Sequence, residues 1–438
     1  MKKHTQSPYE SSKVSYKPSG IEWLGEIPQS WENVSIRSCF TESNQRCNTD
    51  SYPLLSVTIA NGIIYQDDIE NKKDISNDDK SNYKIVPLNA VAYNKMRMWQ
   101  GAVGVNTLTI GIVSPAYIVA IPNEKILPNF VSYLFKSKIM ISEFDKNSYG
   151  LCLDMNNLRY DDFRNIKIPL PPLQEQKEIA EFLDKKCEKI QNYINKKQKL
   201  ITLLQEKKQA LINEVVTKGL NPNIEFKNSG IEYLGLIPHH WEVKKLKYVG
   251  KVVLGKMLCN EHQKGYSHCY YLKSKNLQWL NVEVSQIEKM WFSEYEKSLY
   301  RIKKDDLLVS EGGEVGKTCI WNNELAECYI QNSVHKITLN KFNNAKFFLY
   351  LFFTYGKLGV FDSVVSRVSI AHLVLEKLVN VDMVVPPLQE QKQIANFLDE
   401  KCEKINSAIE KTKRQITLIK EYKNTLINEA VCGRIRVN

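Results

Sequence analysis

The chain consists of two related halves, and this repeat constrains the fold more than any other feature of the sequence. The repeated segments are residues 19–28 with 229–238 and residues 171–190 with 386–405. In the second pair 17 of 20 positions are identical, whereas the segments between the repeats share almost no identity. Because long-period self-similarity marks duplicated structural units, we expect two equivalent halves, each with a variable block followed by a near-constant one.

The near-constant segments carry the pattern of long coiled-coil helices. Each begins with a Pro-Pro pair, at residues 171–172 and 386–387, and proline suits the first turn of a helix. Gly219 is a suitable end for the first helix. Between these limits apolar residues recur about every 3.5 positions, which predicts a helix with a heptad seam in each half.

The two predicted seams use equivalent positions. The seam residues are Leu183, Ile190, Ile194, Ile201, Leu204 and Leu211 in the first helix and Leu398, Ile405, Ile409, Ile416, Ile419 and Leu426 in the second. Because one chain carries both helices with a globular block between them, we expect an intramolecular antiparallel coiled coil with a pseudo-two-fold axis. Lys208 and Lys423 share one seam position, where a lysine either fixes the register or snorkels at a frayed end.

Length and composition are those of an ordinary globular chain. Its 438 residues predict two to four domains, and 43% hydrophobic with 25% charged residues excludes a collagen-like or largely disordered chain. The longest apolar stretch, residues 347–353, is far shorter than the roughly 20 residues that cross a bilayer, and the polar start contains no signal-peptide core. Ten cysteines without a CxxC pair favour reduced thiols. We therefore expect a cytoplasmic protein without a membrane partner.

The variable blocks have the pattern of α+β domains. The strand-like runs are residues 54–59, 90–93 and 117–121 in the first block, and the second block is expected to repeat them in that order with residues 249–254, 306–309 and 318–321. A short helix is predicted near residues 130–135 of the first block and near residues 345–353 of the second. Each block mixes strands with a helix and is long enough for a core of its own.

One loop of the first block combines side chains that suit nucleic acid. Residues 94–104 lie between predicted strands and contain Lys95, Arg97, Trp99 and Gln100. Cations contact phosphates, amides and arginine read base edges, and aromatic rings stack. The net charge of +11 also favours a polyanionic partner, although many proteins that never meet nucleic acid have such an excess. The alternative is an ordinary loop whose Met and Trp side chains enter the core.

The second block contains two patterns that suggest other chemistry. Residues 310–318 form a glycine-rich run at the equivalent point, but three residues separate its glycines where a P-loop needs four, and Glu311 replaces the first glycine. The residues Cys259, His262, His268 and Cys269 could suggest zinc, yet adjacent ligands are unusual in tetrahedral sites and no second pair has matching spacing. We therefore favour DNA-facing or solvent-facing loops over a nucleotide site or a metal site.

Taken together, these motifs resemble the specificity subunit of type I restriction-modification systems. The motifs are the Ile-Glu-Trp/Tyr-Leu-Gly entries, the Pro-Pro-Leu-Gln-Glu-Gln helix starts and the Asn-Lys-Met-Arg-Met-Trp-Gln-Gly and Gly-Gly-Glu-Val-Gly-Lys loops. The resemblance covers essentially the whole chain. It implies a target recognition domain at residues 1–170, a spacer helix at 171–220, a second recognition domain at 221–385 and a second helix at 386–438.

The resemblance also implies a division of labour between subunits. Each recognition domain would read one half of a bipartite, asymmetric duplex DNA site, and the paired helices would set the spacer and hold two methyltransferase subunits. Restriction subunits would join this core to give an adenine-N6 methyltransferase and endonuclease complex. This chain would then have no catalytic residue, metal or cofactor, and S-adenosylmethionine, ATP and Mg would bind the partner subunits.

Candidate DNA-binding residues follow from residue type and position within the two blocks. They are Lys95, Arg97, Trp99, Gln100, Tyr149 and Arg159 in the first block and Lys256, Lys273, Lys275, Asn276, Lys317, Gln331, Asn332 and Arg367 in the second. Among them we expect Lys256, Lys273 and Lys317 to contact phosphates.

Two other classes of function stay open at this point. The first is a coiled-coil adaptor whose globular blocks bind protein, and salt-dependent affinity for duplex DNA distinguishes it from a specificity subunit. The second is an enzyme in its own right, but the sequence has no HExxH, no GxSxG and no glycine-rich methyl-donor loop.

Overall fold

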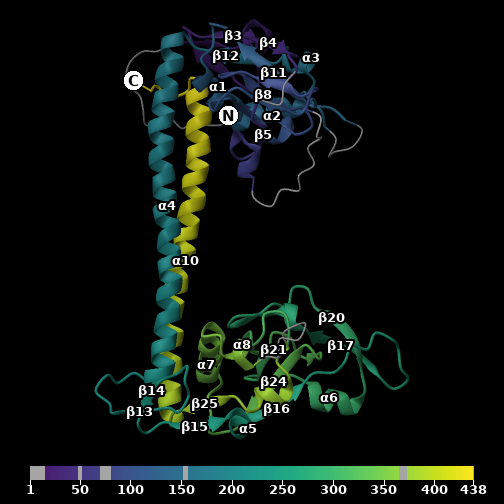
Figure 1. The fold of residues 1–438 in the computed structure, drawn as a ribbon, viewed down its shortest axis with the longest axis vertical. Coiled ribbons are helices and arrows are strands. Elements are labelled where there is room, and N and C mark those ends of the chain that lie inside the picture. The colour runs from purple at the N-terminus through teal and green to yellow at the C-terminus, as the bar shows by residue number, and fades with distance from the viewer. Residues whose placement is uncertain (1–14, 48–51, 70–79, 151–155, 365–371, 438) are drawn as a thin grey trace, which may run out of the picture. The chain divides into compact units, whose positions relative to one another are not determined.

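The computed structural model describes residues 15–47, 52–69, 80–150, 156–364 and 372–437. The chain forms two compact units, residues 1–197 with 414–438 and residues 198–413. Each unit contains one globular part and a portion of each of two long helices, α4 (Leu173–Lys218) and α10 (Leu388–Val431). The repeat therefore appears in the fold as two similar units that share both helices (Figure 1).

The two long helices pack together as an antiparallel pair (Figure 1). The first part of α4 accompanies the last part of α10 in one unit, and the opposite ends are paired in the other unit. Of the predicted seam residues, Leu183, Ile190, Ile194, Leu398, Ile409, Ile416 and Leu426 are buried, and Ile201, Leu204, Leu211, Ile405 and Ile419 are half-buried. The predicted coiled coil is confirmed. Lys208 reaches across the seam and donates to Asn406 Oδ1 at 3.0 Å, so this lysine has a partner on the opposite helix.

The first unit is built on a four-stranded antiparallel sheet with helices packed on it. The sheet order is β4 (Phe40–Ser43), β11 (Tyr117–Pro122), β8 (Val91–Asn94) and β9 (Val103–Val105). Two-stranded ladders pair β1 (Tyr16–Pro18) with β2 (Glu26–Pro28), β3 (Glu32–Ser35) with β12 (Lys167–Leu170), β5 (Leu55–Thr58) with β6 (Gly62–Tyr65) and β7 (Lys84–Val86) with β10 (Gly111–Val113). The helices are α1 (Pro128–Lys136), α2 (Lys138–Lys146) and α3 (Tyr160–Phe163). A buried aromatic group that includes Phe135, Phe144 and Phe163 joins these helices to the sheet.

The second unit repeats this plan and adds a second sheet. Its main sheet has the order β16 (Gly250–Leu254), β24 (Val334–Leu339), β21 (Leu307–Ser310) and β22 (Thr318–Ile320). The added sheet has the order β20 (Glu288–Phe292), β17 (Ser267–Leu272) and β23 (Tyr329–Ile330), and smaller ladders pair β13 (Phe226–Asn228) with β14 (Leu236–Pro238), β15 (Glu242–Lys245) with β25 (Asp382–Val385) and β18 (Leu277–Gln278) with β19 (Asn281–Val282). Its helices are α5 (Leu246–Val249), α6 (Glu294–Tyr300), α7 (Ala345–Lys357), α8 (Val360–Val364) and α9 (Leu375–Leu378).

The two main sheets correspond strand for strand, which corrects the order inferred from sequence. The strands β16, β24, β21 and β22 occupy the places of β4, β11, β8 and β9. The run at residues 249–254 therefore corresponds to residues 40–43, not to the first predicted run at residues 54–59. The sequence pattern missed β24 because its segment contains His335 and Lys336, which are polar yet buried in the sheet. The other predicted strands and both short helices are present.

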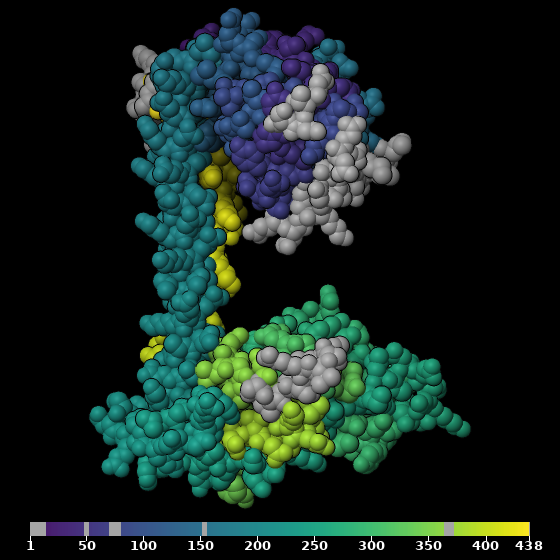
Figure 2. Space-filling view, in the orientation of Figure 1, coloured from purple at the N-terminus to yellow at the C-terminus, as the bar shows by residue number. Residues whose placement is uncertain are grey.

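The apolar helix α7 explains how the second domain is anchored to the long helices. All of its residues from 347 to 355 are buried, because one side packs on the main sheet and another on α4 and α10. A helix buried on several sides is apolar all round. Figure 2 shows the globular part of the second unit packed against the last part of α4 and the first part of α10.

A glutamine of each near-constant segment joins the long helix to its own domain. Gln176 accepts a hydrogen bond from the Leu127 amide at 2.8 Å, and Gln391 accepts one from the Asn344 amide at 2.8 Å. Leu127 and Asn344 are the residues immediately before α1 and α7. Both glutamine side chains are fully buried, and each also donates to the carbonyl of the first proline of its segment. The glutamine thus satisfies an otherwise unpaired amide at the start of a domain helix.

A tyrosine and an aspartate make a second equivalent link in each unit. Tyr133 of α1 donates to Asp184 of α4 at 2.6 Å, and Tyr350 of α7 donates to Asp399 of α10 at 2.8 Å. Burial, followed by the hydrogen-bonded carboxylate, raises the pKa of both tyrosines. These phenols therefore stay neutral and remain donors at physiological pH.

The repeated tryptophans close the same junctions. Trp31 donates to Glu175 of α4 at 2.7 Å. The glycines that follow the two long helices, Gly219 and Gly433, have φ of +76° and +72°. A Cβ on Gly219 would lie 3.4 Å from the Trp241 ring, and one on Gly433 would lie 3.1 Å from the Trp31 ring. Both positions need glycine for the left-handed backbone, and at Gly433 a Cβ would also lie only 2.5 Å from Pro28.

Candidate nucleic-acid interface

The candidate loop of the first domain is anchored by one buried residue, and its polar side chains are at least partly exposed. It connects β8 to β9 through a 3-10 turn at Met98–Gln100, and Met98 is fully buried. Arg97 and Gln100 are exposed, whereas Lys95 and Trp99 are half-buried. Of the Met and Trp side chains that the alternative of an ordinary loop places in the core, Met98 lies there and Trp99 is half-buried, whereas the cations and the amide are at least partly accessible.

A lysine that the sequence did not single out ties this loop to its neighbour. Lys136, at the end of α1, donates to the carbonyls of Thr58 at 3.2 Å, Ile59 at 2.7 Å and Gly101 at 3.0 Å. Thr58 and Ile59 belong to the β5–β6 turn, and Gly101 belongs to the candidate loop. Burial lowers the pKa of Lys136 to about 8. Lysine is common in the last turn of a helix, so no pattern in the sequence distinguishes this one.

The two remaining candidates of the first domain lie beside the same loop. The Leu158 amide donates to the Lys95 carbonyl at 2.9 Å, which brings the neighbouring Arg159 next to the loop. The Arg159 guanidinium lies 5.4 Å from the centroid of the Tyr149 ring. Arg159 and Tyr149 are both exposed. All six candidates of the first domain therefore come from segments that lie side by side.

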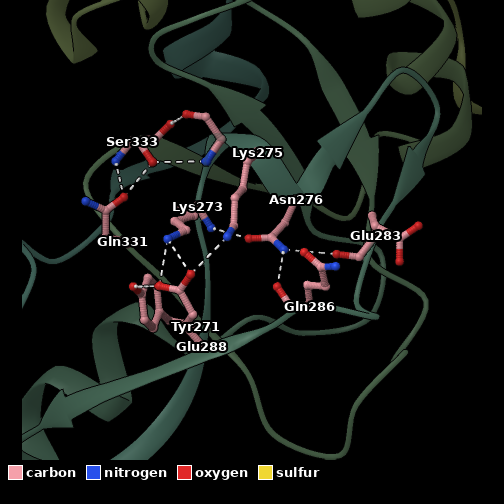
Figure 3. Close-up of polar contacts among 10 residues, drawn as sticks. Tyr271, Lys273, Lys275, Asn276, Glu283, Gln286, Glu288, Gln331 and Ser333 are labelled. Carbon is pink, nitrogen blue, oxygen red and sulfur yellow. Dashed lines mark hydrogen bonds and ion pairs between the residues drawn. The ribbon is translucent and has the colours of Figure 1, made fainter. Parts of the chain in front are cut away.

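In the second domain, the candidate segments meet at the turn formed by residues 331–333. The Ser274 amide donates to Ser333 Oγ at 3.0 Å, and Ser274 Oγ donates to the Ser333 carbonyl at 2.8 Å (Figure 3). The Glu311 amide also donates to the Ser333 carbonyl, at 2.9 Å. The Asn332 amide donates to the Lys256 carbonyl at 2.8 Å. Four segments that are far apart in sequence thus share one turn.

A carboxylate stands among the lysines at this turn. Glu288 accepts from Lys273 at 2.6 and 2.7 Å, from Lys275 at 2.9 Å and from the Tyr271 hydroxyl at 2.9 Å (Figure 3). The hydrogen bonds from Lys273, Lys275 and Tyr271 lower the pKa of Glu288 to about 2. Burial, followed by the bond to Glu288, raises the pKa of Tyr271 to about 12. Glu288 was not among the candidates from the sequence, because its partners lie 13 to 17 residues away along the chain.

Two of the expected contacts are turned inward. The Lys256 side chain is 10% exposed, pairs with Glu296 at 2.6 Å and donates to the Trp291 carbonyl at 2.8 Å. Asn276 is 3% exposed, accepts from the Lys273 amide at 3.1 Å and so fixes the turn that carries the lysines. Both side chains have partners inside the domain that would have to give way before either could contact DNA, so the expectation for Lys256 and Asn276 stays a prediction.

The remaining candidates of the second domain are partly accessible. Lys317 pairs with Glu314 at 2.7 Å at the end of the β21–β22 loop. Gln331 donates to Asn332 Oδ1, and its own Oε1 accepts from the Ser333 amide at 3.1 Å. Arg367 lies outside the described residues.

The other two patterns of the second domain take different forms in the structure. Residues 311–317 connect the antiparallel strands β21 and β22, whereas a P-loop connects a strand to a helix. His262 and His268 pack against the Trp291 ring at 4.6 and 4.7 Å between centroids. Among the described residues no group of three or more His, Cys, Asp or Glu side chains could hold a metal ion. In the same part of the chain, no helix is long and apolar enough to cross a membrane.

Comparison with known proteins gives the same family throughout the chain. The sequence profile of the family described as type I restriction modification DNA specificity domain matches residues 28–205 and again residues 238–418. A Methanocaldococcus jannaschii chain assigned as the specificity subunit of the type I restriction enzyme MjaX is 26% identical, over 94% of this chain and 96% of that one. The type I restriction enzyme MjaVIII specificity subunit of the same organism is 27% identical over 75% of each chain.

Solved structures share the fold at low sequence identity. A chain from a structure concerned with complex assembly and conformational transition of the type I restriction-modification system superposes with a TM-score of 0.72 at 16% identity. That match covers 93% of this chain and 99% of the other. The HsdS subunit from Thermoanaerobacter tengcongensis superposes with a TM-score of 0.55 at 17% identity, over 93% of this chain and 98% of that one.

Proposed function

The chain belongs to the family of type I restriction-modification DNA specificity subunits and carries two copies of the family's domain, and we propose on this basis that each domain reads one half of a bipartite duplex DNA site. The carrying observation is the convergence of the candidate residues. In each domain, cations and amide side chains from more than one segment gather around one loop or turn, and the first domain also has Trp99 and Tyr149 there. Phosphate contacts would set position there, and base-edge contacts would set sequence.

In the first domain we assign this role to the loop of residues 94–101 together with Tyr149 and Arg159. Arg97 and Gln100 are exposed on the loop, so they are available to base edges, and Lys95 is available to a phosphate. Trp99 keeps its indole nitrogen bonded to the Met96 carbonyl at 3.1 Å, so its ring acts as a stacking or packing surface.

In the second domain we assign the role to the turn of residues 331–333 and its neighbours. Lys273 and Lys275 supply phosphate contacts, and Lys317 approaches from the β21–β22 loop. Gln331 and Asn332 supply side-chain amides that are hydrogen-bonded to each other in this structure. Once that hydrogen bond is broken, both amides can bond to the edges of adenine or guanine.

The helices α4 and α10 are the proposed spacer and the proposed site of assembly. Two methyltransferase subunits would bind there, and restriction subunits would join them. S-adenosylmethionine, ATP and Mg would bind those partner subunits. The complex would lie in the cytoplasm. This assignment rests on the family and on the two copies of the helix and domain, which offer two equivalent places for one kind of partner.

The test is methylation mapping. The chain is co-expressed with its cognate methyltransferase subunit, and adenine methylation is mapped across a random-sequence duplex library. Methylation at a split motif with a fixed gap is the expected result. A stable complex that methylates no DNA would contradict the proposal and favour a protein adaptor.

A further inference from the structure

Glu288 occupies the place where a DNA phosphate would bind the lysines of the second domain. It is the first residue of β20 and pairs across the ladder with Tyr271 of β17. Both of its oxygens accept a bond from Lys273, and Lys275 binds one of them (Figure 3). A carboxylate and a phosphodiester each present two oxygens that share one negative charge. The two lysines therefore already hold an anion of the kind that DNA would offer.

The contacts use the acceptor capacity of the carboxylate fully. An ionised carboxylate has about four acceptor positions, and Glu288 receives four hydrogen bonds, two of them from Lys273. The cluster nevertheless lies at the surface, because the side chains of Glu288 and Lys275 are 47% and 52% exposed. A phosphate can thus reach the lysines, and to take the place of the carboxylate between them it must displace Glu288.

A purely structural role does not account for this arrangement. Exposed ion pairs contribute little to stability, because solvent screens them. The turn that carries the lysines is already fixed by the buried Asn276 and by the two hydrogen bonds between Ser274 and Ser333. Glu288 is therefore not needed to shape the turn, and its main effect is on the charge that the turn presents.

We propose that Glu288 is an internal competitor of DNA phosphate for Lys273 and Lys275, and that it limits the binding of the second domain to DNA of the wrong sequence. The inference rests on the proposed function. On unrelated duplex DNA, replacing the carboxylate of Glu288 by a phosphate contributes little binding free energy, because one anion takes the place of another. At the correct half-site, base contacts accompany the exchange and favour it. Glu288 thus raises specificity at some cost in affinity.

The experiment compares the full-length wild-type chain with Glu288→Gln in binding to two duplexes over a range of salt concentrations. One duplex contains the mapped site and the other is unrelated. Glu288→Gln is expected to bind the unrelated duplex about tenfold more tightly, and its slope of log affinity against log salt should steepen by about one to two, since up to two lysines are released. The ratio of specific to unrelated affinity should fall.

Two further variants make the result specific to the cluster. Glu400→Gln removes the partner of Lys404 on α10 and changes net charge equally, and it should leave the salt slope unchanged. Adding Lys273→Gln and Lys275→Gln to Glu288→Gln should abolish the gain. A gain that persists without the two lysines would overturn the inference, because general charge would then be the cause.

The remaining outcomes separate the inference from the proposed function. Wild-type and Glu288→Gln chains of equal affinity and slope would refute the competitor role and leave the proposed function standing. Loss of binding confined to the mapped site would also refute it, since Glu288 would then read a base. If neither chain binds duplex DNA, both the inference and the proposed function fail.

Discussion

At the residue scale, Lys136 controls how two loops of the first domain lie together. As an ammonium it has three N–H groups, and three carbonyls accept from it. Lys136→Met keeps the length of the side chain but leaves those carbonyls without a donor. Because one hydrogen bond to a charged group contributes about 1.5–3 kcal/mol, we expect at least a roughly tenfold loss of affinity for the mapped DNA site.

The matched control for this prediction is Lys146→Met. Lys146 lies on α2, pairs only with Glu143 in the described structure, and is 60% exposed. Binding isotherms of the two variants on the same duplex make the comparison. Equal affinities for Lys136→Met and wild type would show that the two loops hold their positions without this lysine.

The Glu288 cluster also predicts an acid-range effect on stability. The pKa of Glu288 is lowered to about 2 in the folded chain, whereas an unfolded chain has the ordinary value near 4.5. Its contribution to stability is therefore full above about pH 4.5 and is lost as pH falls toward 2. The difference in melting temperature between wild type and Glu288→Gln should be constant from pH 8 to pH 5 and should shrink from pH 5 to pH 3. A difference that grows on acidification would contradict the assignment.

The candidate residues also show what the sequence could and could not predict about exposure and burial. Residue types placed Lys95, Arg97 and Gln100 in an accessible loop, because Gly-punctuated segments between strands lie at the surface. Sequence could not tell that Lys256 is buried against Glu296 while Lys275 is exposed. That difference depends on which acidic residue the fold brings near each lysine, and spacing along the chain does not encode it.

At the element scale, Gln176 and Gln391 should each stabilise only their own domain. Gln176→Ala removes the acceptor of the Leu127 amide and leaves a buried donor unpaired at the start of α1. The expected cost is about 2–3 kcal/mol, because removing a buried partner costs the desolvation of the group left behind. Hydrogen exchange measures it: amides of α1 should lose protection, whereas those of α7 should keep it.

The reciprocal variant and an exposed neighbour serve as controls. Gln391→Ala should lower protection in α7 and leave α1 unchanged, since the two junctions are equivalent. Gln174→Ala removes an exposed glutamine whose side chain, among the described residues, bonds Glu178 in the same helix, and it should affect neither domain. Equal loss in both domains after a single glutamine substitution would indicate general unfolding.

The elements also show which parts of the fold a sequence can specify. The helices α4 and α10 were predictable because a heptad seam is a local, repeated signal that many residues share. The strand β24 was not predictable in this way, since His335 Nε2 donates to the Leu373 carbonyl, 2.6 Å away, and Lys336 donates to two carbonyls inside the domain. A polar residue can be buried in a strand when other groups satisfy its hydrogen bonds, and here those groups come from segments that are distant in the sequence.

At the scale of the whole molecule, the helices should set the gap between the half-sites. The helix α4 runs through both compact units without a break over 46 residues. Inserting one heptad between residues 197 and 198 and another between residues 413 and 414 keeps the seam in phase, because seven residues are one repeat of it. Seven residues add about 10 Å, which corresponds to roughly three base pairs at 3.4 Å each.

Methylation mapping with this double insertion is the decisive measurement for the spacer. The half-site letters should stay the same, because neither insertion touches a recognition loop, and the preferred gap should lengthen by about three base pairs. An insertion in one helix alone shifts one seam past the other, so it should weaken pairing and reduce methylation instead of moving the gap. New half-site letters with an unchanged gap would show that the domains choose their spacing without the helices, and the spacer role would then have to be abandoned.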